Sequence, residues 1–350
     1  MHIVKEYKRI IEYKGVTTEK ETKKYVFYNH TIVICFDRNH NISVFIRGGQ
    51  TFSYSKTKLL KATLPFIIIF GHIYQHTGYG SDFKVSGIYC VALFFFISGY
   101  GLEKKSAINL KYIATRIAKV LLPLLVPVCI YLTIQYSAFD MDIGALVKDS
   151  LIHYNLIVPY SWFFITLILL YVVFFLCRAI TIKYNKLLIP LVTFALCSIS
   201  ALYLKCGLQG TYHISNFAFL AGVLMSKYED SIMAVFHMAK GRLMLAVLLL
   251  ITLCVALHPF KGSIYINVFL YSFAVAIVLS LLKDFTNRFI NFFKDMSFEL
   301  YTCQGIAFLL IPCDKTQPLT YALSIITATI LLAWMTSKIN HSLIKGNKQA

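Results

Sequence analysis

The 350-residue sequence contains few charged side chains for its length. Asp, Glu, Lys and Arg make up 14% of the chain, whereas hydrophobic residues make up 58%. A water-soluble domain of this size would hide so much apolar surface poorly, because a folded protein keeps a large accessible surface. Continuous apolar runs of roughly 18 residues or more instead suit helices that cross a lipid bilayer. These runs also lack the alternating pattern of a membrane β-barrel.

Acidic residues are especially scarce, since 16 of them stand against 34 Lys and Arg. The resulting charge of +18 could indicate nucleic-acid binding, but its distribution favours a membrane. The apolar runs predict ten spans, near residues 59–80, 84–102, 113–135, 160–180, 187–205, 212–228, 242–258, 264–282, 297–313 and 319–340. With a cytoplasmic N-terminus, 29 of the 34 basic residues fall on the inner side, in agreement with the positive-inside rule. We therefore expect an all-α polytopic membrane protein with both termini in the cytoplasm.

The nine cysteines include no Cys-x-x-Cys pair, and most of them lie inside apolar runs. They are expected to be small core residues, which excludes a disulfide framework or a cysteine zinc site. Internal repeats and low-complexity tracts are also missing. A transporter built from inverted halves would favour such a repeat.

The N-terminal region is basic and lacks the short apolar core of a signal peptide. Two β-like runs, 31–36 and 42–46, flank residues with turn chemistry at 37–41 and predict a small hairpin. We expect this hairpin to lean on the membrane domain or the lipid surface. The expected organisation is a cytoplasmic extension over 1–55, a ten-span domain over 56–342 and a cytoplasmic tail over 343–350.

A histidine, His72, lies inside the first apolar run. A titratable group at membrane depth is costly and indicates function. His72 follows Lys61 by eleven residues, roughly 16 Å along a helix, which predicts a position past the membrane midplane. A neutral imidazole is favoured there and can accept a proton as a general base. The alternative is a structural histidine bonded to a neighbouring helix. His76, one turn further, completes only a weak metal site.

Other polar residues gather near the predicted inner face. Arg116 and Lys119 share one face of a helix. They could fix the topology by snorkelling, or they could bind the phosphates of a cytosolic cofactor. Ser98 and Tyr100 flank a glycine at the end of the second run, where they could serve close packing or hydrogen bonds between helices.

Three further residues have simple structural interpretations. Glu299 lies at the inner interface, where a salt bridge with Lys294 or a nearby loop would satisfy it. Trp162 begins the fourth run and could anchor it at the outer interface. Asn216 in the sixth run could bond between helices.

Taken in order, these motifs resemble the acyltransferase-3 family of integral membrane O-acyltransferases. The matching elements are His72, the run Phe95-Phe-Ile-Ser98-Gly-Tyr100, Arg116-Ile-Ala-Lys119 before Pro123, Ser161-Trp162-Phe163, Phe217-Ala-Phe-Leu-Ala-Gly222 and Ser297-Phe-Glu299-Leu-Tyr301. The positions that differ from the usual family pattern are Lys61 and Lys119 in place of Arg, Leu64 in place of Ala, and Gln304 in place of His.

The resemblance implies transfer of an acyl group, commonly acetyl from acetyl-CoA, to a carbohydrate hydroxyl. It implies His72 as the base, Lys61 as positive charge near the donor or oxyanion, and Arg116 and Lys119 as ligands of the cofactor phosphates. Residues implied around the substrate cavity are Ser98, Tyr100, Trp162, Glu299 and Tyr301. Expected partners are acyl-CoA, a cell-surface or lipid-linked glycan and membrane lipids, without nucleic acid, metal or a permanently bound cofactor. The expected location is the bacterial cytoplasmic membrane.

Two alternatives remain at this stage. One is a polytopic transporter in which His72 relays protons. The other is a catalytically impaired homologue, given the substitutions at Lys119 and Gln304. For an active enzyme, the depth of His72 leaves two routes open. Either the acyl group reaches deep along a channel from the cytosol, or the acceptor enters from the outer side.

Overall fold

The computed structural model describes residues 24–28, 32–36, 42–46, 53–80, 83, 85–105, 108–152, 157–182, 184–207, 211–232, 246–247, 250–251, 253 and 264–346. The chain divides into two compact units, Met1–Gln50 and Thr51–Ala350.

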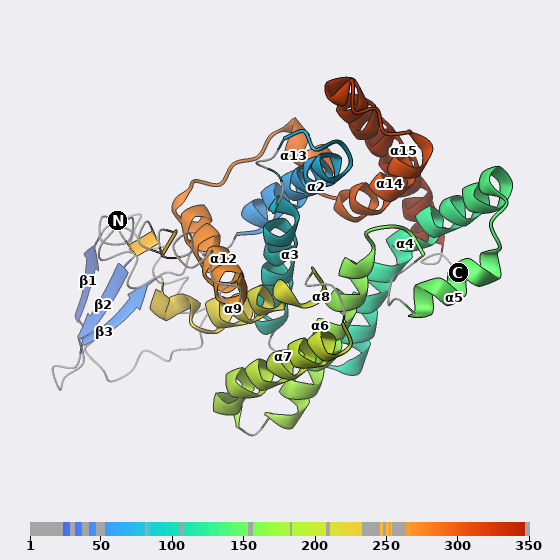
Figure 1. The fold of residues 1–350 in the computed structure, drawn as a ribbon. Coiled ribbons are helices and arrows are strands. Elements are labelled where there is room, and N and C mark those ends of the chain that lie inside the picture. The colour runs from blue at the N-terminus through green and yellow to red at the C-terminus, as the bar shows by residue number, and fades with distance from the viewer. Residues whose placement is uncertain are drawn as a thin grey trace. The chain divides into compact units, whose positions relative to one another are not determined.

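The first unit contains a three-stranded antiparallel sheet in the order β1-β2-β3 (Figure 1). The strands are β1 (Lys24–Tyr28), β2 (Ile32–Phe36) and β3 (Ile42–Ile46). β2 and β3 coincide with the two β-like runs of the sequence, and Ile32 pairs with Ile46. β1 is an addition that the sequence analysis did not predict. The turn expected at 37–41 lies outside the described residues.

The second unit is helical in its described part (Figure 1). Its longer helices are α2 (Tyr54–Thr77), α3 (Ser86–Glu103), α4 (Leu110–Phe139), α5 (Ile143–Ile152), α6 (Trp162–Ile180), α7 (Leu188–Lys205), α9 (Asn216–Lys227), α12 (Ile264–Leu281), α14 (Ser297–Leu310) and α15 (Pro318–Gly346). Short helical segments are η2 (Asn185–Leu187), α8 (Thr211–Ile214) and α13 (Arg288–Phe293).

Helices lie within nine of the ten predicted ranges, and the seventh range, 242–258, falls largely outside the described residues. The sixth range is divided between α8 and α9. Among the described residues, five helices are long and apolar enough to cross a membrane: α3, α4, α6, α7 and α15. α2 is not one of them. It carries Lys56, Lys58 and Lys61 in its first turns, and these lower its mean hydropathy. The ten crossings and the cytoplasmic termini stay predictions.

α3 and α9 approach each other closely at the centre of the helical unit. A Cβ placed on Gly99 would lie 2.2 Å from the carbonyl oxygen of Phe219, and one on Gly222 would lie 2.0 Å from that of Phe96. Both distances are far below van der Waals contact, so only glycine lets the two backbones meet here. Small residues serve this role in membrane helix pairs, where packing rather than the hydrophobic effect drives association.

A proline interrupts the backbone hydrogen bonding of α2 between Lys61 and His72. α2 begins after Ser53, whose side chain accepts from the amide of Lys56, and ends at Gly78 in the left-handed conformation. Pro65 lies inside this helix. Because proline has no N–H, the carbonyl of Lys61 loses its usual partner four residues on.

Candidate active site

His72 on α2 is buried and bonded to α14. Its Nδ1 lies 3.1 Å from Oε1 of Gln304. The Gln304 side chain is fully buried, and its Nε2 donates to the carbonyl oxygen of Tyr301 at 2.9 Å. Thus two hydrogen bonds join the histidine, the amide and one turn of α14 in series. A buried polar chain of this kind is costly to disturb, because each member would lose its partner away from water.

Tyr160 covers one face of the His72 ring. The two rings stack with centroids 3.9 Å apart and planes 19° apart. The Tyr160 hydroxyl lies 2.8 Å from Nε2 of His76, and His76 in turn stacks on Phe308 at 4.5 Å. An aromatic and imidazole cluster therefore surrounds His72 at one end of α2.

The backbone of Tyr160 adopts an unusual conformation, with φ of 66°. A bulky residue in the left-handed region is strained, and such strain clusters at functional sites. The same segment packs tightly on α14, where a Cβ on Gly305 would lie 2.9 Å from the carbonyl oxygen of Pro159. This close approach places Tyr160 beside the helix that carries Gln304.

A cavity of about 110 Å³ opens beside His72. Its lining comes from α2, α3, α6 and α14 and consists of Ile68, Gly71, His72, Gln75, Gly87, Ile88, Val91, Trp162 and Tyr301. Two residues expected around a substrate cavity, Trp162 and Tyr301, therefore share this cavity with His72. The volume is well below the roughly 300 Å³ of a typical ligand pocket, so only the reacting part of a substrate fits.

A second cluster gathers the predicted cations. The charge of Lys61 interacts with those of Arg116, Lys119 and Asp295, which brings residues of α2 and α4 together. Arg116 donates from Nε and Nη2 to the hydroxyl of Tyr112, at 3.0 and 2.8 Å. Lys119 is exposed and Lys61 is half-buried. The two expected phosphate ligands, Arg116 and Lys119, thus lie in one region with Lys61, which was expected near the donor or the oxyanion.

Ser98 lies with the cation cluster. The hydroxyl of Tyr171 donates to Ser98 Oγ at 3.4 Å, and Tyr171 also interacts electrostatically with Arg116. Ser98 does not line the cavity beside His72. The structure therefore separates Ser98 from Trp162 and Tyr301, with which it was grouped.

Tyr100 and Glu299 also lie away from the His72 cavity. The Tyr100 hydroxyl donates to Oε1 of the buried Glu229 at 2.9 Å, and Lys104 forms an ion pair with the same carboxylate. Glu299 is buried and accepts from Nδ2 of Asn340 on α15 at 3.3 Å.

Two simple interpretations from the sequence differ from the contacts observed. Lys294, considered as a partner of Glu299, instead pairs with Asp295 at 3.5 Å. Asn216, considered as a bond between helices, is buried without a hydrogen-bond partner for its amide in the described part of the chain. Trp162 lines the His72 cavity, and its interpretation as an interfacial anchor stays a prediction.

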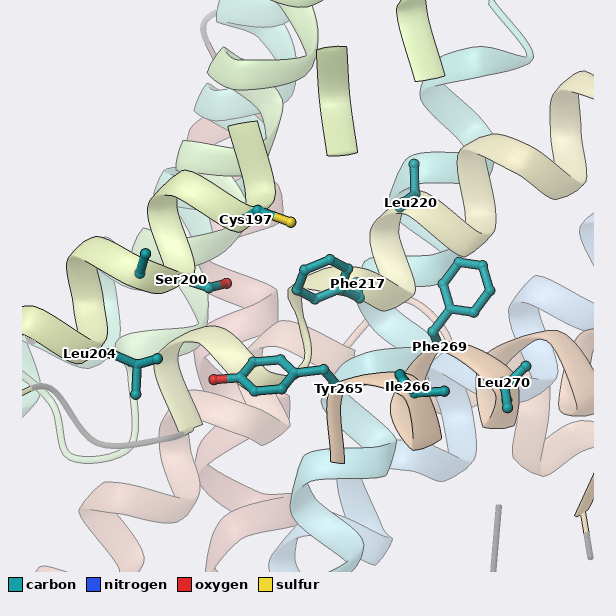
Figure 2. A pocket seen from close by; sticks show the side chains of 10 residues that line it. Cys197, Ser200, Leu204, Phe217, Leu220, Tyr265, Ile266, Phe269 and Leu270 are labelled. Atoms are coloured by element: carbon teal, nitrogen blue, oxygen red, sulfur yellow. The ribbon is translucent and has the colours of Figure 1, made fainter. Parts of the chain in front are cut away.

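A larger and almost wholly apolar pocket lies elsewhere (Figure 2). It has a volume of about 640 Å³ and lies between α7, α9 and α12, lined by Cys197, Ser200, Ala201, Leu204, Phe217, Leu220, Tyr265, Ile266, Phe269 and Leu270. It contains no acid or base suited to acyl transfer. The described residues also hold no group of three or more His, Cys, Asp or Glu placed for a metal ion.

The sequence analysis missed Tyr160 and the role of Gln304. Gln304 was noticed only as a departure from a family pattern, although an amide inside an apolar run is itself a signal of hydrogen bonding. Tyr160 follows Pro159 in the short segment before α6, and no periodicity marks it. Its importance depends on a contact with α2, 88 positions away from His72 in the sequence.

The fold and site define a helical protein with several helices long and apolar enough to cross a membrane, a buried histidine and a separate cationic cluster. The acyltransferase domain that defines the acyltransferase-3 family matches residues 57–338. The chain therefore belongs to this family and is a membrane acyltransferase. No curated protein and no solved structure matches it.

Proposed function

We propose that this protein transfers an acyl group, in the first place acetyl, from acyl-CoA to a hydroxyl of a cell-surface or lipid-linked carbohydrate. One observation carries the proposal. The buried His72 is hydrogen-bonded through Nδ1 to Gln304 and also lines a small cavity with Trp162 and Tyr301. An imidazole held in this way can serve as a general base for a hydroxyl entering the cavity.

The reaction needs no external oxidant or reductant. His72 takes the proton of the acceptor hydroxyl as its oxygen forms a bond with the thioester carbonyl carbon. The carbon–sulfur bond then breaks, and the proton passes to the departing CoA sulfur. The products are the acyl ester and free CoA. Lys61 contributes positive charge on the donor side, where it attracts the anionic CoA moiety.

The cation cluster suits the phosphates of the donor. Arg116 and Lys119 provide charge-assisted hydrogen bonds, and the guanidinium of Arg116 can bind phosphate through two parallel N–H groups. The eleven residues between Lys61 and His72 correspond to roughly 16 Å along α2. The donor phosphates would stay at the cationic end while the thioester extends towards His72. The acceptor would then reach the cavity from the opposite side of the membrane, most simply as a periplasmic or outer-face glycan.

Purified protein tests this proposal directly. His72→Gln should lower acyl transfer from labelled acetyl-CoA by roughly 10²- to 10⁴-fold, the usual contribution of a general base. The matched control is His341→Gln on α15, because in the described part of the chain His341 forms a local hydrogen bond, to the carbonyl of Ser337 four residues before it. Full turnover by His72→Gln would refute the assigned role. Solute uptake into proteoliposomes without donor turnover by the unaltered protein would instead favour the transporter.

A further inference from the structure

We propose that Gln304 is a positioning residue that fixes His72 in the tautomer protonated on Nδ1. Nε2 then carries the lone pair that accepts the proton of the acceptor. The catalytic consequence rests on the proposed function, whereas the tautomer itself follows from the hydrogen bonds alone.

The orientation of the Gln304 amide follows from its second contact. Nε2 of Gln304 lies 2.9 Å from the carbonyl oxygen of Tyr301, an atom that can only accept a hydrogen bond. The amide nitrogen must therefore face Tyr301, and the amide oxygen must face His72. An amide rotated by 180° would bring two oxygen atoms together at Tyr301 and so lose this bond.

The tautomer of His72 follows in turn. Oε1 of Gln304 can only accept, and it lies 3.1 Å from Nδ1 of His72. Nδ1 must therefore carry the hydrogen. In a neutral imidazole the other nitrogen, Nε2, then lacks a hydrogen and can act as a base. Because Gln304 is fully buried, water does not compete for these bonds.

Tyr160 restrains the same ring in a second direction. The hydrogen bond to Gln304 fixes one edge of the imidazole, and the stacked Tyr160 ring, 3.9 Å away, fixes its plane. Both contacts also favour the imidazolium that forms during transfer. The amide oxygen accepts from a charged donor, and the aromatic face attracts a cation.

Two substitutions at Gln304 separate the acceptor atom from the shape of the side chain. Gln304→Met keeps an unbranched side chain of similar length but removes the amide oxygen. Gln304→Glu, in its protonated form, keeps a carbonyl acceptor towards His72 and a hydroxyl that can still donate to the Tyr301 carbonyl. The control is Gln135→Met on α4, because Gln135 is also a buried glutamine but bonds to Tyr131 instead.

The first readout is ¹⁵N NMR of protein labelled at histidine, because protonated and unprotonated ring nitrogens give distinct signals. Subtraction of the His72→Gln spectrum assigns the His72 signals. We expect protonated Nδ1 and unprotonated Nε2 in the unaltered protein, in Gln135→Met and in Gln304→Glu. Gln304→Met should show a mixture of tautomers. A His72 protonated on Nε2 in the unaltered protein, or an unchanged tautomer in Gln304→Met, would overturn the proposal.

The second readout is acyl transfer from labelled acetyl-CoA. Gln304→Met should lower kcat about tenfold, as expected for the loss of one buried hydrogen bond, with the donor KM changed less than about twofold. Gln304→Glu should restore most of kcat. A kcat in Gln304→Met equal to that of Gln135→Met would refute the positioning role. If no protein turns over acetyl-CoA but the tautomers follow the expected pattern, the proposed function fails while the inference about Gln304 stands.

Discussion

The close contact between α3 and α9 predicts that replacing glycine by alanine lowers stability at position 99 but not at position 101. In Gly99→Ala the new Cβ would lie 2.2 Å from the carbonyl oxygen of Phe219. The obstacle is backbone, so the two helices must separate by about 1 Å to restore contact. Overpacking of this kind costs about 1–3 kcal/mol. It outweighs the gain of about 1 kcal/mol from replacing glycine by alanine within a helix.

Gly101→Ala is the matched control, because the nearest atom to its new Cβ is Nη2 of Arg116 at an ordinary distance of 3.9 Å. Only the helix-propensity gain remains there, so stability should stay equal or rise slightly. The assay is the apparent melting temperature of each protein in one detergent at one heating rate, since membrane proteins of this size often unfold irreversibly. Gly99→Ala should melt several degrees below Gly101→Ala. Equal melting temperatures would refute the argument that backbone contact requires glycine at position 99.

Two further predictions concern charged residues. Arg116→Gln should raise the KM for acetyl-CoA about tenfold or more, since it removes a charge-assisted hydrogen bond, and should weaken the salt dependence of KM. Lys111→Gln, an exposed change in the first turn of α4, should do neither, and equal effects of the two variants would contradict a specific phosphate site. In the Lys104–Glu229 pair, the side chains are 45% and 6% exposed. Lys104→Met should therefore destabilise by about 2 kcal/mol by leaving a buried carboxylate short of its cation, whereas Glu229→Gln should cost less than about 1 kcal/mol. A larger loss of thermal stability in Glu229→Gln than in Lys104→Met would refute the claim that the unpaired buried carboxylate is the main cost.

The helix positions could be predicted because long apolar runs bounded by basic residues leave few other structures in a membrane. The position of Arg116 and Lys119 on one helical face could also be predicted, because the two residues are three apart in the sequence. Their approach to Lys61 depends on how the fold arranges α2 and α4, which periodicity does not specify. The family resemblance supplied that link, because it implied Arg116 and Lys119 as phosphate ligands and Lys61 as positive charge near the donor or the oxyanion.

The surroundings of His72 could not be predicted from local patterns. Tyr160 reaches the imidazole only because its backbone adopts a left-handed conformation and because Gly305 admits Pro159. Neither condition leaves a periodic signal in the sequence. Similarly, Ser98 and Tyr100 lie two residues apart but point to different partners, Tyr171 and Glu229. A motif that looked like one unit therefore serves two separate contacts.

Pro65 separates the part of α2 that carries Lys61 from the part that carries His72. The missing amide hydrogen at residue 65 frees the carbonyl of Lys61 and removes one rung of the helical ladder. Bending is easiest where such a rung is absent. The cationic end of α2 can thus adjust to an arriving donor while the end that carries His72, held by Gln304 and Tyr160, keeps its alignment.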